Sequence, residues 1–216
     1  MPPKVKICGI RTIGAAITAI NDSADFLGFI HFPKSPRHLT LNAMADLIKA
    51  IRNVNATIPL VSVVVNPEND LLETLRDEVK PDLIQLHGKE TPERVAKIAT
   101  LTKLPLIKAV SVCKKSDLDG VSAFEPHVEY MMFDAKAPKD AALPGGLGLS
   151  FDWTIMQGYT GVKPWFLAGG LSVENAAEAV QLSGAPMLDV SSGVESAPGV
   201  KDNGLISGFL KAAKSL

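Results

Sequence analysis

The residues of this chain best suited to proton transfer stand at the ends of apolar segments. Cys8 closes "KVKIC" and precedes Gly9, and Asp134 follows "EYMMF". A thiol acts as a base only when ionised, and an unperturbed thiol titrates near pH ~8.5, so Cys8 needs a nearby cation or helix N-terminus for that task. A partly buried carboxyl group can act as a general acid. A base and an acid that face one pocket suit an isomerisation.

Each of these two residues also has a purely structural interpretation. A single Cys at the end of a strand is commonly a buried apolar side chain, and Cys8 alone is explained that way. Asp134 can cap the turn that follows it in the chain. The chemical interpretation therefore depends on both side chains reaching the same rim.

Two glycine-containing segments near the end of the chain are candidates for anion binding. "FLAGGLSVENA" contains Gly169 and Gly170, and "LDVSSGVES" contains Ser192 and Gly193. Glycine lets backbone N–H groups approach a phosphate closely, although each pair alone is explained equally well by a turn. The occurrence of both after late strands favours a phosphate site.

Arg37 and His87 are the remaining candidates for binding a small molecule. Arg37 in "PKSPRH" can hold a carboxylate through its planar guanidinium, or it can be a solvated loop cation. His87 ends a strand and is expected to form hydrogen bonds at the rim. His31 and His38 share a loop without a carboxylate or Cys at ligand spacing, so no metal site is predicted.

Eight short apolar segments alternate with stretches of helical periodicity. Several of these segments are almost continuously apolar, which is typical of parallel strands covered on both faces. The segments are Val5–Cys8, Phe26–Phe32, Leu60–Asn66, Leu83–His87, Leu106–Val112, Tyr130–Ala135, Trp165–Ala168 and Met187–Ser191. Amphipathic stripes lie between most of them, and the stretch after the fifth is short and weakly helical. We expect a parallel eight-stranded (β/α)8 TIM barrel with an irregular fifth helix.

A doubly wound open sheet is the alternative fold, but it usually has fewer strands. Gly9 and Gly14 have the spacing of P-loop glycines, yet Ala15 and Ala16 stand where Lys and Ser/Thr are required, which excludes a Walker motif. In a (β/α)8 barrel the carboxyl ends of the strands form the active-site rim. The candidate residues follow strands at this rim, so we expect them to share one pocket.

Bulk composition fits one domain spanning residues 1–216 and excludes several classes of partner. The net charge of −1 offers no attraction for nucleic acid or an anionic membrane, and no apolar run approaches a membrane span. The first ten residues lack the apolar stretch of a secretory signal, so we expect a cytoplasmic protein without a disulfide. A small-molecule partner is therefore expected, and the chain is predicted to be a monomer or homodimer.

Eight sequence blocks together resemble the phosphoribosylanthranilate isomerase family of tryptophan biosynthesis. The blocks are "VKICGI", "LGFIHFPKSPRHL", "IQLHG", "MMFDA", "FDW", "PWFLAGGL", "DVSSGVE" and "PGVKD", in order from Val5 to Asp202. The resemblance implies an Amadori rearrangement of N-(5-phosphoribosyl)anthranilate to 1-(2-carboxyphenylamino)-1-deoxyribulose 5-phosphate. It implies no cofactor and no metal.

The resemblance also implies a role for each candidate residue. Asp134 would protonate the furanose oxygen, Cys8 would remove the C2 proton of the ribose, and Arg37 would hold the anthranilate carboxylate. Gly170, Ser192 and Gly193 fall in the blocks that bind phosphate in the family.

The segment Gly145–Ser150 departs from the family pattern. It reads "GGLGLS" where relatives often have "GGTGKT", so Leu147 and Leu149 replace a hydroxyl and a lysine. Substrate contacts by those two side chains are absent here. Two other functions stay open at this point: a different phosphosugar isomerase, and a barrel that binds phosphate without catalysis.

Overall fold

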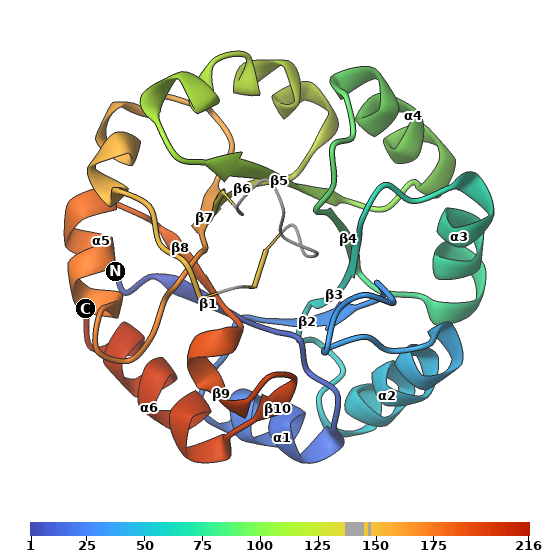
Figure 1. The fold of residues 1–216 in the computed structure, drawn as a ribbon. Helices are drawn as coiled ribbons and strands as arrows, with labels where there is room; N and C mark the ends of the chain where they lie inside the picture. The colour runs from blue at the N-terminus through green and yellow to red at the C-terminus, as the bar shows by residue number, and fades with distance from the viewer. Residues whose placement is uncertain (137–144, 147) are drawn as a thin grey trace.

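All eight apolar segments form strands, and the strands close into a barrel (Figure 1). A computed structural model describes residues 1–136, 145–146 and 148–216. The strands follow one another around the barrel in chain order, each parallel to its neighbours, and β8 closes on β1. The (β/α)8 fold predicted from the sequence is confirmed.

Each strand begins within one residue of its predicted start. The strands are β1 Lys4–Cys8, β2 Phe26–Ile30, β3 Leu60–Val64, β4 Leu83–Leu86, β5 Leu106–Val112, β6 Tyr130–Ala135, β7 Trp165–Leu167 and β8 Met187–Val190. Five of them end one or two residues earlier than predicted, because the rim residues leave the ladder. Asn66, for example, has a φ of 45° in the left-handed region and ends the extended backbone after β3.

Helices cover the outside of the barrel. They are α1 Ile13–Asn21, α2 Leu41–Val54, α3 Asn69–Thr74, α4 Pro92–Thr102, α5 Ala176–Ser183 and α6 Asn203–Lys214, and α3 continues as a π-helical turn, Leu75–Val79. Four begin at a side chain that accepts a backbone N–H of the first turn: Thr12, Thr40, Thr91 and Asp202. Such caps fix where each helix begins after its rim loop.

The fifth crossover is irregular, as predicted. Three short 3₁₀ turns, Lys115–Leu118, Val121–Ala123 and Glu125–His127, connect β5 to β6. A further 3₁₀ turn, Trp153–Gly158, precedes β7. After β8, the turn Ser192–Val194 leads into a small antiparallel hairpin of β9 Glu195–Ala197 and β10 Val200–Lys201.

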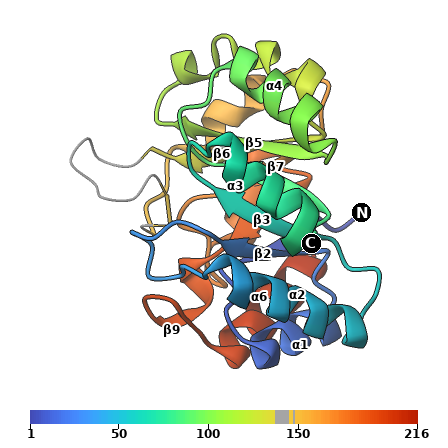
Figure 2. The ribbon, with the colours of Figure 1, turned by 90° about the vertical axis from the view of Figure 1, so that its right-hand side faces the viewer.

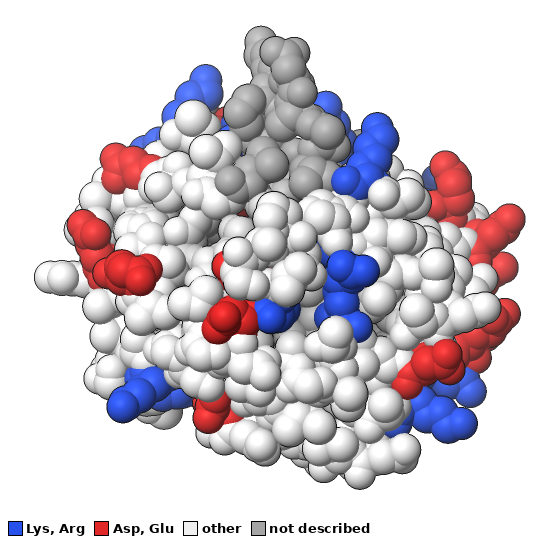
Figure 3. All heavy atoms as spheres, turned by 60° about the horizontal axis from the view of Figure 1, so that its bottom comes forward, with Lys and Arg blue, Asp and Glu red and all other residues white. Residues whose placement is uncertain are grey.

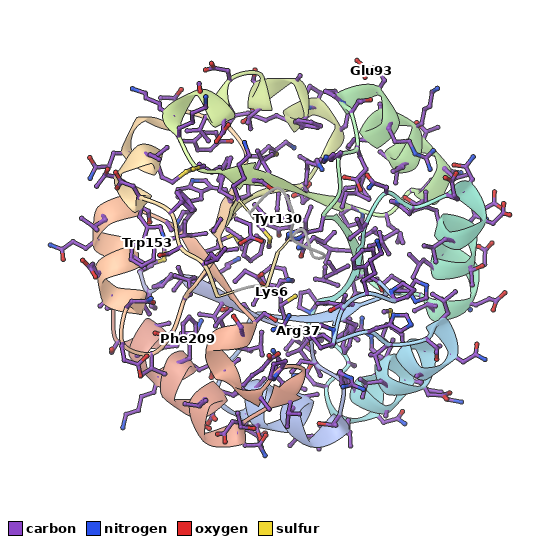
Figure 4. All side chains as sticks on the ribbon, viewed as in Figure 1. Lys6, Arg37, Glu93, Tyr130, Trp153 and Phe209 are labelled. Carbon is purple, nitrogen blue, oxygen red and sulfur yellow. The ribbon has the colours of Figure 1, made fainter. Side chains whose placement is uncertain are left out.

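Apolar side chains form two cores, one between strands and helices and one inside the barrel. Figure 4 shows Phe209 and Trp153 in the outer layer and Lys6 and Tyr130 inside the ring of strands. In the helices, Ile13, Ala177 and Leu205 fit the spacing of an apolar stripe but are exposed, and Ala15 and Ala179 are buried. Alanine at the buried positions lets these helices lie close to their neighbours.

The hairpin and the charged side chains can be located on the surface of the barrel. Viewed from the side, the β9 hairpin lies on the opposite side from the N-terminus (Figure 2). On the face drawn in Figure 3, basic and acidic side chains are scattered over the surface, and several acidic ones lie close together along the right-hand edge. None of the described helices is long and apolar enough to cross a membrane.

Candidate active site

One pocket at the carboxyl ends of the strands gathers most of the predicted site residues. The lining includes seven of the eight: Cys8, Arg37, His87, Asp134, Gly169, Gly170 and Ser192. They come from β1, β6 and the loops after β2, β4, β7 and β8. Residues far apart in the chain therefore converge on one cavity, as the barrel topology requires.

Cys8 is the last residue of β1 and is almost fully buried. Burial raises the pKa of its thiol, and the nearby Asp189 carboxylate acts in the same direction. The ammonium groups of Lys6 and Lys201 oppose this shift, because a nearby positive charge favours the thiolate. Burial outweighs the two cations, so the pKa of the Cys8 thiol lies above its ordinary value.

Asp134 is also buried, and both of its carboxylate oxygens have partners. Its Oδ1 accepts the backbone N–H of Ala135 at 2.9 Å, and its Oδ2 lies 3.0 Å from Nε2 of His87. The side-chain amide Nε2 of Gln85 lies 2.8 Å from Nδ1 of His87. His87 thus bridges the side-chain amide of Gln85 and the carboxylate of Asp134.

Arg37 is buried and engages a partner that the sequence did not indicate. Its Nε and Nη2 donate to the two carboxylate oxygens of Glu195 at 2.7 and 2.8 Å, and Lys201 donates to the same carboxylate at 2.7 Å. Gly9, at a φ of 78°, lets the arginine pass, since an added Cβ would lie 2.7 Å from its Cδ. The Nη1 edge faces Gly146, whose added Cβ would lie 2.7 Å from it. Arg37 therefore presents a single edge to the pocket rather than its full fork.

The loops after β7 and β8 pack closely against each other. Gly169 and Gly170 have left-handed φ values of 89° and 62° and line the pocket with Ser192. Gly193 is not among the described lining residues. An added Cβ there would clash with the carbonyl oxygen of Leu171, so Gly193 serves the contact between the two loops.

Several residues of the site carry no motif that sequence reasoning singled out. Gln85, Asp189 and Ser191 line the pocket, and Glu195 lies behind Arg37. Gly28 in β2, which lies beside Cys8, could have been found from the sequence. A glycine inside an apolar strand often marks a place where another group comes close to the backbone. The paired acids and amides give no such signal, since their partners lie on other strands.

The segment Gly145–Ser150, whose sequence differs from the family pattern, is described except for one residue. Leu147 lies outside the described residues, and Leu149 is exposed at the pocket. Within the described part of the chain, no group of three or more His, Cys, Asp or Glu side chains is placed to hold a metal ion.

The fold and the pocket define a (β/α)8-barrel protein whose small-molecule site lies at the carboxyl ends of the strands. Residues 5–212 match the family model of N-(5'-phosphoribosyl)anthranilate isomerase. Proteins of that name from Caulobacter sp. and Paramagnetospirillum magneticum are 47% and 46% identical over 98% and 99% of this chain, and 98% of each relative is covered. The chain belongs to the N-(5'-phosphoribosyl)anthranilate isomerase family, and it is an isomerase of tryptophan biosynthesis.

Solved structures agree with this membership. Phosphoribosyl anthranilate isomerase from Thermotoga maritima matches at a TM-score of 0.87 with 32% identity, over 99% of this chain and all of that one. A structure of the isomerase with reduced 1-(o-carboxyphenylamino)-1-deoxyribulose 5-phosphate matches at 0.83 with 30% identity, over 99% and 100% of the two chains. A second Thermotoga maritima structure, at a TM-score of 0.83 and 31% identity over 99% and 100% of the chains, is of monomers generated from a dimeric enzyme.

Proposed function

We propose that this chain converts N-(5-phosphoribosyl)anthranilate to 1-(2-carboxyphenylamino)-1-deoxyribulose 5-phosphate, with Asp134 as general acid and Cys8 as general base. The observation that carries this proposal is that both side chains line one pocket beside Arg37 and the two glycine loops. The reaction needs one group to give a proton and another to take one within a single pentose.

Asp134 begins the reaction by protonating the furanose oxygen while the C1–O bond breaks. This leaves a protonated Schiff base between C1 and the anthranilate nitrogen. The carboxylate that remains keeps its contacts with Nε2 of His87 and with the N–H of Ala135.

Cys8, as the thiolate, then takes the proton from C2. The electrons of that C–H bond form a C1–C2 double bond, and the electron pair of the C=N bond returns to nitrogen. The resulting enolamine becomes the ketone when C1 takes a proton from the Cys8 thiol and the C2 hydroxyl gives its proton to the Asp134 carboxylate. These transfers restore the acid and the base, and because the rearrangement moves hydrogen within one molecule, it needs no external redox partner.

The two negative ends of the substrate fit opposite parts of the rim. The Nη1 edge of Arg37 would bind the anthranilate carboxylate as a charge-assisted donor. The phosphate would lie at the backbone N–H groups near Gly169, Gly170 and Ser192, where glycine permits close approach. Gly193 would contribute by holding the two loops together.

The proposal is tested with Cys8→Ala and Asp134→Asn. We expect each to lower kcat by roughly 10²- to 10⁴-fold, the usual effect of losing an acid or a base. Titration calorimetry with the reduced product analogue should show binding close to that of the unaltered enzyme. Cys113→Ser is the matched control, because Cys113 is the exposed thiol. Turnover near the unaltered level in either active-site variant contradicts its assigned role.

Substrate choice separates this function from the other two. Activity on aldose or ketose phosphates that lack the aromatic amine, and none on the anthranilate riboside, identifies a different phosphosugar isomerase. Restored growth of a tryptophan auxotroph without its isomerase supports catalysis by this chain and argues against a barrel that only binds phosphate.

A further inference from the structure

A lysine and a thiol share the inner face of the first strand. Lys6 and Cys8 are two residues apart on β1, so both side chains point to the same side. Opposite Cys8 on β2 stands Gly28, which has no side chain to occupy the space. An added Cβ at Gly28 would lie 2.9 Å from Sγ of Cys8 and 3.1 Å from Nζ of Lys6, so these two atoms are within about 6 Å of each other.

Lys6 is an unusual residue for the interior of a barrel. It has no exposed surface, and its Nζ donates to Oδ1 of Asp189 at 2.8 Å. Asp189 stands beside it in the β1–β8 register. An ion pair in such a place is weak evidence for stability, because desolvation of both charges opposes their attraction. A buried pair next to a candidate base therefore invites a functional explanation.

The charges around the thiol come from several elements. Among the charged groups, Lys6 on β1 and Asp189 on β8 have the largest influence on the pKa of the thiol. Lys201 on β10 adds a second positive charge. The other titratable groups that line the same pocket are Arg37, His87 and Asp134. Lys201 and Arg37 both donate to Glu195, so one carboxylate serves two cations there. Of the cations around the thiol, Lys6 has the largest effect in favour of the thiolate.

We propose that Lys6 is a positioning residue for the proposed base: its ammonium, anchored by Asp189, is the counter-charge that lets Cys8 exist as a thiolate inside the barrel. This proposal rests on the proposed role of Cys8. Burial alone raises the pKa of the thiol, and the ammonium of Lys6 is the strongest influence in the opposite direction. Lys6 itself keeps its proton: burial would lower its pKa, but Asp189 and Cys8 outweigh burial and raise it.

The proton balance follows from this arrangement. Lys6 stays an ammonium throughout, Asp189 stays a carboxylate, and only Cys8 changes its state when it receives the C2 proton. Before catalysis the thiolate and the carboxylate share the field of one ammonium. After proton transfer the thiol is neutral and the Lys6–Asp189 pair remains.

The experiment measures ionisation of Cys8 directly. In a Cys113→Ser background only Cys8 can react with iodoacetamide, and the rate of alkylation against pH follows the thiolate fraction. Lys6→Met should move the midpoint to higher pH by roughly 1–3 units, the effect of losing an opposite charge at this range. Asp189→Asn should move it to lower pH. Opposite shifts from two partners of one ion pair are not expected of a merely structural pair.

Steady-state kinetics provide the second readout. Lys6→Met should lower kcat and move the rising limb of its pH profile upward, with KM for the substrate much less affected. If Lys6→Met does not fold because Asp189 is left unpaired, the double variant Lys6→Met/Asp189→Asn removes both charges. Its midpoint should lie above that of the unaltered protein, since Lys6 influences the thiol more strongly than Asp189 does.

The outcomes are distinct from those of the proposed function. An alkylation midpoint that stays unchanged or falls in Lys6→Met, or that does not rise in the double variant, overturns the role of Lys6. Full turnover by Cys8→Ala overturns the role of Cys8 as base and leaves the alkylation result to report on charge alone.

Discussion

Replacement of Glu195 by Gln should destabilise the chain strongly and loosen Arg37. The Glu195 carboxylate accepts from Nε and Nη2 of Arg37, from Nζ of Lys201 and from the N–H of Gly199, and its side chain is only 3% exposed. A neutral amide leaves two buried cations without a counter-ion. Breaking a buried pair by removing one partner costs about 3–5 kcal/mol.

This loss has a defined dependence on pH. Burial alone would raise the pKa of Glu195, but hydrogen bonds from Arg37 and the charge of Lys201 outweigh it and hold the pKa below its ordinary value. A depressed pKa in the folded state means that the stabilisation is present above the unfolded-state pKa of about 4.3 and is lost as pH falls through the folded value. The variant should therefore differ from the unaltered chain fully at pH 7 and progressively less below about pH 4.

Urea unfolding followed by circular dichroism, at pH 7 and below about pH 4, measures the loss of stability. With a slope of about 2–3 kcal/mol/M, the midpoint should fall by roughly 1–2 M at neutral pH. Glu129→Gln is the matched control, because Glu129 is exposed; it should change the free energy of unfolding by less than about 0.5 kcal/mol. Equal midpoints for Glu195→Gln and the unaltered chain at pH 7, or a difference that grows in acid, would refute this reasoning.

Three glycines give further predictions. Gly28→Ala should lower kcat, because the added Cβ would lie 2.9 Å from Sγ of Cys8 and displace the proposed base; a kcat equal to that of the unaltered enzyme contradicts the packing described here. Gly193→Ala should lower the free energy of unfolding by about 1–3 kcal/mol, the usual cost of overpacking, because its Cβ would clash with the Leu171 carbonyl. Gly14→Ala in α1 meets no atom within 4 Å and should instead stabilise by about 0.5–1 kcal/mol, which the same unfolding measurement checks.

The barrel could be predicted because each strand can be recognised from its own segment of sequence. Parallel strands covered on both faces read as continuous apolar runs, so each start was found within one residue. Helix faces were read less well. Ile13 fits the helical spacing but lies in the first turn of α1 and is exposed, whereas the small Ala15 and Ala19 face the barrel. Periodicity reports which residues share a face, and packing decides which face is buried.

The site residues that could be predicted are those recognisable from residue type and position within a single segment. Cys8, Asp134 and the glycines stand at strand ends, and topology alone brings them to one rim. The partners of Arg37 and Lys6 could not be found in this way. Glu195 lies 158 positions from Arg37 and Asp189 lies 183 from Lys6, so each pair exists only once the barrel closes β8 on β1.

Three groups of buried ion pairs lie around the proposed chemistry in the described residues, and their placement argues for a common purpose. Lys6–Asp189 lies beside the thiol, Glu195 pairs with both Arg37 and Lys201 and joins the loop after β2 to the hairpin, and Lys108–Glu90 lies between β5 and the loop after β4. Glu90 also accepts the N–H of Gly88, the residue that follows His87. Hydrophobic pairs of similar size would stabilise such positions at least as well, so stability alone does not explain them. Each pair instead fixes the position or the charge of one group that the proposed mechanism requires: the base, the carboxylate anchor, or the histidine that holds the acid.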